Sequence, residues 1–295
     1  MTNDFILQDR VQKIQQVVKE YGERNFYISY SGGKDSNVLS TLIDIALPNN
    51  QIPRVYCNTG IEYKLMSDFV QQKYNSDRRF LIVQPKVPIT KMLQEVGYPF
   101  KSKQHSHYLE TYQNNGYNPE QQSVAHYLGN VGTWSRQQQC PKCLRYQFDP
   151  QTPLPFKVSP KCCDELKKKP MKDWMRRRDK KYSINGLMRE EGGQRRSAQC
   201  MSFRDGYFKS FQPLAPLTKE WEDWFINEYD IQLPELYYAP YNFDRTGCKG
   251  CPFAINLQHE LDMLEKLLPN ERKQCEIIWK PVYEEYRRIG YRLHN

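Results

Sequence analysis

The sequence predicts an α/β protein in which a parallel β-sheet is flanked by helices, and two patterns in its first third carry this prediction. One is a series of short β-prone runs at Phe26–Tyr30, Arg54–Cys57 and Phe80–Val83. The other is a helical spacing of apolar residues around these runs, in Asp9–Tyr21 and again from Val38 to Ile43. Strands that alternate with helices along a chain usually run parallel, so the pattern indicates a parallel sheet.

The rest of the chain is expected to contain an insertion, one more strand and a helical part. Residues 101–160 are rich in Gln, Asn, Tyr, Gly and Pro, which predicts a loop-rich insertion with few regular elements. A further strand is predicted at Lys181–Leu187. The C-terminal part, residues 219–295, contains three segments with helical spacing: Lys219–Glu228, Leu257–Leu268 and Asn270–Arg288. We therefore expect a single domain over residues 1–295.

Composition points to a globular protein of a reducing compartment. The chain has 295 residues, and its 39% hydrophobic content can fill a core. Its N-terminus lacks the apolar run of a signal peptide, and no segment reaches transmembrane length. Nine cysteines without an export signal favour metal or redox chemistry over disulfides. We therefore expect a cytoplasmic protein with no membrane partner.

Positive charge is concentrated in one stretch of the sequence. The formal net charge is +9, and basic residues outnumber acidic ones about two to one between Lys161 and Arg196. Such a stretch can attract phosphate-rich ligands, including nucleic acid. A solvated charged face is the equally balanced alternative.

A glycine-rich turn between the first predicted strand and the next helix has the chemistry of a phosphate-binding loop. Backbone N–H groups without bulky side chains would lie there at the positive end of a helix dipole. The serines can hydrogen-bond to phosphate, Lys34 adds positive charge, and Asp35 can hold Mg²⁺ or cap the helix. The loop is Ser31, Gly32, Gly33, Lys34, Asp35 and Ser36. A plain strand-turn-helix corner with a capping residue is the alternative, and the Walker spacing is absent.

The Ser-Gly-Gly-Lys-Asp-Ser loop resembles the PP-loop of ATP pyrophosphatases and of the adenylyl-sulfate and phosphoadenylyl-sulfate reductases. The resemblance implies a Rossmann-like sheet of the adenine nucleotide α-hydrolase type that binds ATP or an adenylyl-sulfate-type nucleotide with Mg²⁺. Two further segments are similar to nucleotide-side segments of this family: Asn58-Thr59-Gly60-Ile61-Glu62 and Asn185-Gly186-Leu187-Met188-Arg189.

By this resemblance, Thr59, Gly60 and Glu62 join the loop in binding the nucleotide. Arg189, Arg195 and Arg196 would face its phosphate or sulfate, and Lys34, Asp35 and Arg189 would act in catalysis. Taken on their own, these arginines can bind an anion by bidentate contacts. Ion pairs with Glu190 and Glu191 are an equal alternative.

Four cysteines have a spacing that suits an iron–sulfur cluster. Cys162 and Cys163 are adjacent, and Cys248 and Cys251 form a Cys-x-x-Cys turn far along the chain. Adjacent thiolates can each bind a different iron, which favours a cluster over a single zinc ion. The arrangement resembles the [4Fe–4S] site of the adenylyl-sulfate reductases, and Lys167 matches the lysine that accompanies that cluster.

A second Cys-x-x-Cys leaves the metal assignment open. Cys140 and Cys143 could combine with Cys248 and Cys251 in an ordinary Cys₄ zinc site, which would leave Cys162 and Cys163 without a role. The remaining cysteines, Cys57, Cys200 and Cys275, are expected to be core or incidental thiols.

The last residues of the chain distinguish between two activities known in the family that it resembles, sulfonucleotide reduction and adenylation for sulfur transfer. The reductases carry a nucleophilic cysteine in a short Glu-Cys-Gly-Leu-His-type tail, whereas Ile289–Asn295 contains none. We therefore expect a PP-loop enzyme that adenylates a substrate, DNA or tRNA among them, so that sulfur can replace the activated oxygen. The basic stretch Lys167–Lys181, with Trp174 in it, would grip nucleic acid, and a cysteine desulfurase or another donor would supply sulfur. A thioredoxin-dependent reductase and a non-catalytic nucleotide-binding subunit of a modification or defence complex are the alternatives.

Overall fold

We analysed a computed structural model of the chain, which describes residues 2–132, 135–136 and 138–294. The contacts divide the chain into two compact units. The first comprises Met1–Asn58, Glu62–Gln84 and Lys169–Thr246, and the second comprises Thr59–Ile61, Pro85–Lys168 and Gly247–Asn295. Of the helices in the described ranges, none has the length and apolar character needed to cross a bilayer.

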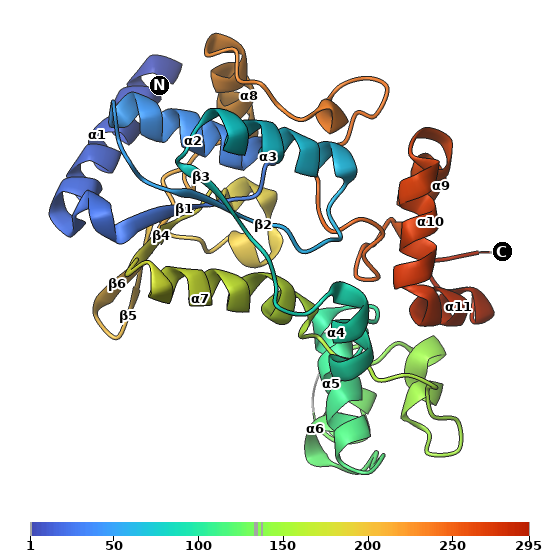
Figure 1. The fold of residues 1–295 in the computed structure, drawn as a ribbon. Coiled ribbons are helices and arrows are strands. Elements are labelled where there is room, and N and C mark those ends of the chain that lie inside the picture. Colours follow the sequence, from blue (N-terminus) through green and yellow to red (C-terminus); the bar gives the residue numbers. More distant parts are fainter. Residues whose placement is uncertain (1, 133–134, 137, 295) are drawn as a thin grey trace. The chain divides into compact units, whose positions relative to one another are not determined.

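The first unit is built on a six-stranded sheet with the order β3-β2-β1-β4-β6-β5 (Figure 1). Neighbouring strands are parallel except β5, which pairs antiparallel with β6 at one edge. The strands are β1 (Phe26–Tyr30), β2 (Arg54–Cys57), β3 (Phe80–Val83), β4 (Tyr182–Ile184), β5 (Met201–Arg204) and β6 (Tyr207–Phe211). The predicted α/β class with a parallel sheet flanked by helices is therefore confirmed.

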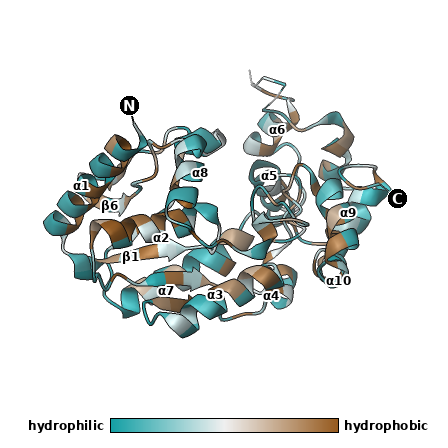
Figure 2. Cartoon of the chain, turned by 90° about the horizontal axis from the view of Figure 1, so that it is seen from above, coloured by the Kyte–Doolittle hydropathy of each residue, from teal (hydrophilic) through white to brown (hydrophobic). Residues whose placement is uncertain are grey.

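Alternate residues of the central strand β1 point to two separate layers of packing. Tyr27 packs against Trp174 of α7, with 5.4 Å between the ring centroids, in a cluster that includes Val55. The neighbouring Ile28 is fully buried, and the hydroxyl of Tyr30 donates a hydrogen bond to Asn37 of α2. In Figure 2, hydrophobic colour is concentrated on β1 and α2. The two-residue period of the strand thus directs side chains to both faces of the sheet, as a parallel sheet requires.

The helices of the first unit carry apolar stripes that cover this sheet. Helix α1 buries Ile14, Val17 and Val18, and α2 is buried along most of its length. The helices of this unit are α1 (Asn3–Tyr21), α2 (Lys34–Ala46), α3 (Lys64–Ser76), α7 (Lys169–Arg177) and α8 (Lys219–Glu228).

The second unit is mainly helical and has its own aromatic core. Phe100 lies 4.7 Å from Tyr286 between ring centroids, and the Tyr286 hydroxyl accepts a hydrogen bond from the backbone N–H of Lys101. Its helices are α4 (Ile89–Val96), α5 (Lys103–Asn114), α6 (Gln122–Leu128), α9 (Leu257–Leu267), α10 (Pro269–Ile278) and α11 (Lys280–Arg288).

The expectation of few regular elements in residues 101–160 is wrong, because α5 and α6 both lie there. The Ser102 side chain caps α5 by accepting a hydrogen bond from the backbone N–H of His105. Polar side chains then form part of the core: His105 bonds to Tyr127 and Gln147, each at 2.8 Å, and all three are buried. A composition that reads as a polar loop therefore folds around a hydrogen-bonded aromatic cluster. The expected single domain stays a prediction.

Other predicted elements agree with the structure except at edges and breaks. The strands predicted at β1, β2 and β3 are confirmed with the same bounds, and the predicted strand Lys181–Leu187 is the shorter β4. The predicted helix Asn270–Arg288 is two helices, α10 and α11, that meet at Trp279. Pro281 lacks the N–H that a continuous helix needs, which accounts for the break. The β5–β6 hairpin was not predicted.

His105 makes the second unit sensitive to acid. Burial lowers the pKa of His105 from its usual 6.5 to about 3. The unfolded chain therefore takes up a proton below about pH 6.5 that the folded chain does not, and stability falls as the pH falls. We expect a loss of about 1.4 kcal/mol per pH unit within this window. Urea unfolding between pH 7 and pH 5 measures it.

His105→Gln is expected to remove this acid dependence, whereas the control His107→Gln, at an exposed position of the same helix, is expected to keep it. Parallel stability curves for the wild type and His105→Gln would contradict the assignment.

Candidate functional site

The phosphate loop connects β1 to α2 through a glycine that no other residue could replace without strain. Gly32 has a φ of +79°, and a Cβ there would meet the Met66 side chain and lie 2.9 Å from Val70 Cγ2. Both the positive φ and the close approach of α3 therefore require glycine. Gly33 is the N-cap of α2 and makes no side-chain cap hydrogen bond. A plain strand-turn-helix corner stays the alternative interpretation of this loop.

Side chains of α2 hold the backbone of this loop in place. Asn37 Nδ2 donates to the carbonyl oxygens of Gly32 and Gly33 at 2.7 and 2.9 Å. Ser36 Oγ donates to the Gly33 carbonyl at 2.8 Å, and the backbone N–H of Gly33 donates to Ser31 Oγ at 3.3 Å. The loop is thus ordered by its own contacts, which lowers the entropic cost of binding an anion at the start of α2.

Two residues that the sequence patterns did not identify, Tyr237 and Thr246, lie beside the loop. The hydroxyl of Tyr237 accepts a hydrogen bond from the backbone N–H of Lys34 at 3.2 Å and lies 3.0 Å from Thr246 Oγ1. The Tyr237 hydroxyl thus accepts a hydrogen bond from a backbone N–H group that could otherwise donate to a phosphate oxygen. Tyr237 lies on a short 3₁₀ turn, Glu235–Tyr237, about two hundred residues from the loop, so no local pattern identifies it.

Carboxylates gather at the start of α2. Burial raises the pKa of Asp35, and the negative charge of Glu191 raises it further. Glu222 of α8 is hydrogen-bonded to Asp35, and burial together with the charge of Asp35 raises the pKa of Glu222 to about 8. Lys34 Nζ lies 3.3 Å from Asp223 Oδ1. Glu222 and Asp223 were not predicted as site residues, because they lie in a helix whose pattern indicates only amphipathic packing.

The three predicted anion-binding arginines are exposed, and two of them have local partners. Arg189 Nε donates to the Ala198 carbonyl at 2.5 Å. Arg195 forms an ion pair with Glu191, which also pairs with Arg245. For Arg195 the structure thus contains the ion pair that was the alternative to anion binding, although its positive charge also lowers the pKa of Asp35. The roles of Arg189, Arg195 and Arg196 stay predictions.

The segment predicted as a second nucleotide-side loop is divided between the two units. Thr59 and Gly60 belong to the second unit and Glu62 to the first. Thr59 and Glu62 are buried, and Gly60 has a φ of +82°. In the second unit, the neighbouring Ile61 carbonyl accepts a hydrogen bond from the backbone N–H of Lys249 at 3.0 Å. This segment is therefore attached to the Cys248–Cys251 turn.

The second unit contains all four cysteines that were predicted as cluster ligands. Cys162 and Cys163 lie 4.0 Å apart between their sulfur atoms. The hydrogen bond to Cys163 and burial raise the pKa of Cys162, and the charges of Cys251 and Cys248 raise it further. Burial and the charge of Cys248 raise the pKa of Cys251 to about 12. The four thiols are thus electrostatic neighbours.

Cys163 differs from Cys162 and Cys251 in favouring the thiolate. The hydrogen bond from Cys162 lowers the pKa of Cys163 to about 6, and the positive charges of Lys103 and Lys167 contribute. A π-helical turn, Asp164–Lys168, follows directly and contains Lys167, whose charge acts on this thiol. Within the described ranges, no three His, Cys, Asp or Glu side chains are arranged to hold a metal ion.

The Cys248–Cys251 turn is held by the C-terminal helices. The backbone N–H of Gly250 donates to Glu260 at 2.9 Å, and Tyr283 donates to the Gly250 carbonyl. Lys249 is buried in an ion pair with Glu271, and its carbonyl accepts a hydrogen bond from the Trp279 indole at 3.1 Å. The predicted helical C-terminal part therefore holds the backbone of this turn in place within its unit.

Gly250→Ala is expected to destabilise the second unit. Gly250 has a φ of +58°, and a Cβ there would lie 2.8 Å from Cys275 Sγ. Gly290 offers a matched control, because its φ is +61° but a Cβ would meet nothing within 4 Å. We expect Gly250→Ala to cost about 1–3 kcal/mol more than Gly290→Ala, since only the former adds overpacking to backbone strain. Equal losses in urea unfolding would contradict this packing.

The second Cys-x-x-Cys, Cys140 and Cys143, differs in its electrostatic surroundings from the predicted cluster ligands. Burial raises the pKa of Cys140 to about 12, opposed mainly by the positive charges of Lys101 and Arg145. Cys143 is exposed. Neither is among the groups that most affect the pKa values of Cys162, Cys163 and Cys251, which act on one another instead. Cys275 is fully buried, as expected for a core thiol.

The basic stretch Lys167–Lys181 ends in an amphipathic helix. The side chains of Lys169, Lys172 and Arg176 on α7 are exposed, whereas Trp174 is 6% exposed and packs on Tyr27. The expectation that Trp174 takes part in gripping nucleic acid is therefore wrong, because its ring belongs to the core beneath the sheet. The helix has one apolar and one basic face, which was the alternative interpretation.

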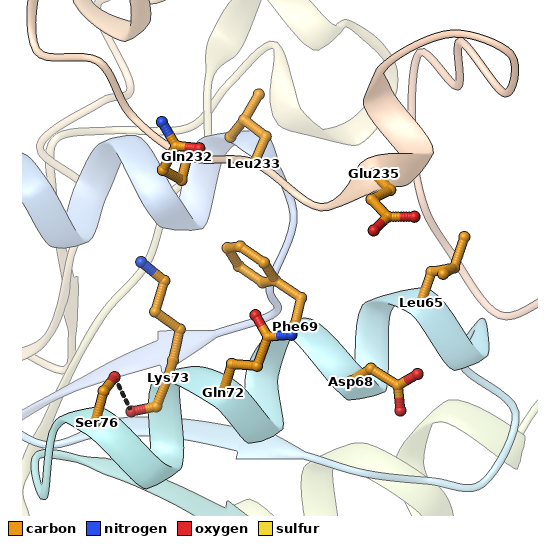
Figure 3. A pocket seen from close by; sticks show the side chains of 9 residues that line it. All are labelled: Leu65, Asp68, Phe69, Gln72, Lys73, Ser76, Gln232, Leu233 and Glu235. Atoms are coloured by element: carbon orange, nitrogen blue, oxygen red, sulfur yellow. Dashed lines mark hydrogen bonds between the residues drawn. The ribbon is translucent and has the colours of Figure 1, made fainter.

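A groove in the first unit lies away from these residues. It has a volume of about 540 Å³ and is bordered by α3 and the segment 232–235, with Phe69, Lys73 and Glu235 among its lining side chains (Figure 3). None of the predicted site residues lines it. The phosphate loop and this groove are thus separate features.

Comparison with known proteins identifies a domain family. Residues 131–254 match the phosphoadenosine phosphosulfate reductase domain. An uncharacterized protein of Methanocaldococcus jannaschii is 23% identical over 265 residues, which are 85% of this chain and 49% of that protein. The chain thus spans about half the length of this relative.

Three solved structures are remotely similar to the chain. A phosphoadenylyl-sulfate reductase from Candida auris has a TM-score of 0.43 and 11% identity, covering 82% of this chain and 95% of that one. An NH₃-dependent NAD synthetase from Campylobacter jejuni has a TM-score of 0.40 and 13% identity, covering 97% of both chains. A U34-tRNA thiolase from Methanococcus maripaludis, solved with its [4Fe–4S] cluster, has a TM-score of 0.39 and 13% identity, covering 98% and 80%.

Proposed function

From the match of residues 131–254 to the phosphoadenosine phosphosulfate reductase domain, we propose that the chain is an ATP-using PP-loop enzyme of sulfur transfer. In this proposal it splits ATP in the manner of a PP-loop pyrophosphatase, adenylates a substrate and carries an iron–sulfur cluster. The observation that carries the proposal is the phosphate loop, a strand-to-helix turn whose backbone is already ordered by Ser36 and Asn37.

The first step would be a transfer of the adenylyl group. An oxygen of the acceptor attacks the α-phosphorus of ATP, a new P–O bond forms, and the bond between the α- and β-phosphates breaks. Pyrophosphate leaves with the electron pair of that bond. Residues Ser31–Ser36 would hold the leaving pyrophosphate with Mg²⁺, and Lys34 would stabilise the charge that develops on it. Arg189, Arg195 and Arg196 would bind phosphate, and Thr59, Gly60 and Glu62 would also contribute to nucleotide binding, as the resemblance implies.

The cluster would be held by Cys162, Cys163, Cys248 and Cys251. This donor set is supported by the 4.0 Å separation of the Cys162 and Cys163 sulfur atoms and by the place of all four cysteines in one unit, and adjacent thiolates suit a cluster. Within the described ranges the four thiols are not arranged around a common metal position, so they would have to move closer together to hold it. When bound, a [4Fe–4S] cluster would supply an iron site at which sulfur can be held for transfer. Zinc at Cys140, Cys143, Cys248 and Cys251 receives less support, because the pKa values of Cys140 and Cys251 respond to different neighbours.

The acceptor and the sulfur donor are further parts of the proposal. The exposed basic face of α7 would contact the phosphate backbone of a nucleic acid, DNA or tRNA, through Lys169, Lys172 and Arg176. A cysteine desulfurase or another persulfide carrier would deliver the sulfur. Both reactions would take place in the cytoplasm.

Pyrophosphate release tests the reaction. The holoenzyme, purified without oxygen, is incubated with [γ-³²P]ATP, Mg²⁺, a sulfur donor and either unmodified tRNA or DNA. Labelled pyrophosphate that forms only with one acceptor would support the proposal and identify the acceptor class. ATP bound without turnover for every acceptor would overturn it in favour of a non-catalytic nucleotide-binding subunit.

Reduction of a sulfonucleotide is the second candidate, and the family match to a reductase domain favours it. Against it, Cys275 is fully buried beside Gly250 and is therefore poorly placed to act as a mobile nucleophile. Sulfite release from adenylyl-sulfate or phosphoadenylyl-sulfate with thioredoxin would establish this activity. Absence of sulfite under these conditions would exclude it.

A further inference from the structure

Glu222 carries a buried carboxyl group that is only partly hydrogen-bonded. Its side chain is 4% exposed, and its Oε1 atom makes no hydrogen bond to any residue in the described ranges. It also forms no ion pair with those residues. A buried acceptor left without a partner is costly, so a native protein that keeps one usually has a reason for it.

The other polar contact of Glu222 is the carboxyl group of Asp35 in the phosphate loop. Asp35 lies in the first turn of α2, and Glu222 lies on α8. The backbone of Gly186 closely approaches that of Asp35, because a Cβ on that glycine would lie 2.9 Å from the Asp35 carbonyl oxygen. Two carboxyl groups from different elements are thus held against each other at the start of the loop helix.

The cations nearby are already paired with other acids. Lys34 Nζ lies 3.3 Å from Asp223 Oδ1, while Arg195 and Arg245 both pair with Glu191. Asp35 and Glu222 therefore place two carboxyl groups beside a loop whose N–H groups are suited to phosphate, and each becomes negatively charged when it loses its proton. Bringing a polyphosphate to two carboxylates is repulsive unless a cation lies between them.

We infer that Glu222 and Asp35 together bind a divalent cation, Mg²⁺, which joins the protein to the polyphosphate of the nucleotide. Mg²⁺ is typically bound by one or two carboxylates with phosphate oxygens and water completing its shell, and the unpartnered oxygen of Glu222 supplies one such ligand. The inference rests on the proposed use of ATP, and it assigns the metal to a helix, α8, that lies outside the loop motif.

Binding of Mn²⁺ in place of Mg²⁺ tests the inference without turnover. Free Mn²⁺ is measured by electron paramagnetic resonance while the holoenzyme is titrated, both alone and with α,β-methylene-ATP, whose α–β linkage does not break. The variants are Glu222→Gln, which keeps the size of the side chain, and Glu220→Gln, an exposed position on the same helix. Circular dichroism verifies that each variant is folded.

We expect one nucleotide-dependent Mn²⁺ site in the wild type, a loss of affinity of at least tenfold in Glu222→Gln, and no change in Glu220→Gln. Equal Mn²⁺ affinity in the wild type and Glu222→Gln would overturn the inference, even if the wild type releases pyrophosphate. Conversely, a Glu222-dependent Mn²⁺ site in a protein that releases no pyrophosphate would support the inference while contradicting the proposed function. The two proposals therefore fail separately.

Discussion

Replacing Cys251 by serine is expected to abolish the iron–sulfur cluster. Protein purified without oxygen should contain about four irons per chain and absorb near 400 nm, and the variant should lose most of both. A serine hydroxyl is a poor ligand for iron in such clusters. The Cys248–Cys251 turn is also held by the hydrogen bond from Gly250 to Glu260 and by the ion pair of Lys249 with Glu271, so we expect no neighbouring side chain to replace the lost thiolate. Iron and zinc analysis together with absorption spectra measures the effect.

Two other cysteines serve as controls for this experiment. Cys200 belongs to the first unit and lies within hydrogen-bonding reach of Arg10, so Cys200→Ser should leave the iron content unchanged. Cys140→Ser should also leave it unchanged, because Cys140 interacts with Lys101 and Arg145 instead of the four thiols. A colourless protein with one zinc ion that depends on Cys140 would end the cluster hypothesis and establish the Cys₄ alternative.

Lys34→Met is expected to lower the rate of pyrophosphate release by about 10²–10³-fold, the range typical of removing one group that stabilises charge in a transition state. The substitution keeps the length and the apolar stem of the side chain but removes its charge at the start of α2. Its effect on folding should be small, since its partner Asp223 is exposed and such a surface pair contributes little. Release of labelled pyrophosphate at saturating ATP measures the rate.

Lys64→Met provides the matched control for this variant. Lys64 lies on α3 and pairs with Asp68 of the same helix, so losing its charge should leave pyrophosphate release unchanged. If Lys34→Met retains the wild-type rate, the phosphate loop does not stabilise the leaving group in the way proposed here.

Much of the fold follows from the sequence because the relevant interactions are local. The strands β1, β2 and β3 are short apolar runs bounded by breaks in the helical pattern, so their composition alone identifies them, although only β1 and β2 are buried along most of their length. The hairpin of β5 and β6 was missed because β5 lies at the sheet edge, half of its residues are exposed, and it lacks a continuous apolar run. In residues 101–160, buried His105, Tyr127 and Gln147 resemble loop residues until their mutual hydrogen bonds are seen.

The candidate site shows the same division between sequence and tertiary structure. Adjacent residues by themselves predict the phosphate loop from glycines between a strand and a helix, and the spacing of the cysteines predicts one set of metal ligands. Both stay predictions. Only the tertiary structure brought Glu222 and Tyr237 to the loop and removed Trp174 from the predicted nucleic-acid surface. The physical reason is that burial and pairing depend on contacts between distant segments, and no local pattern records which side of a helix will meet a particular strand or loop.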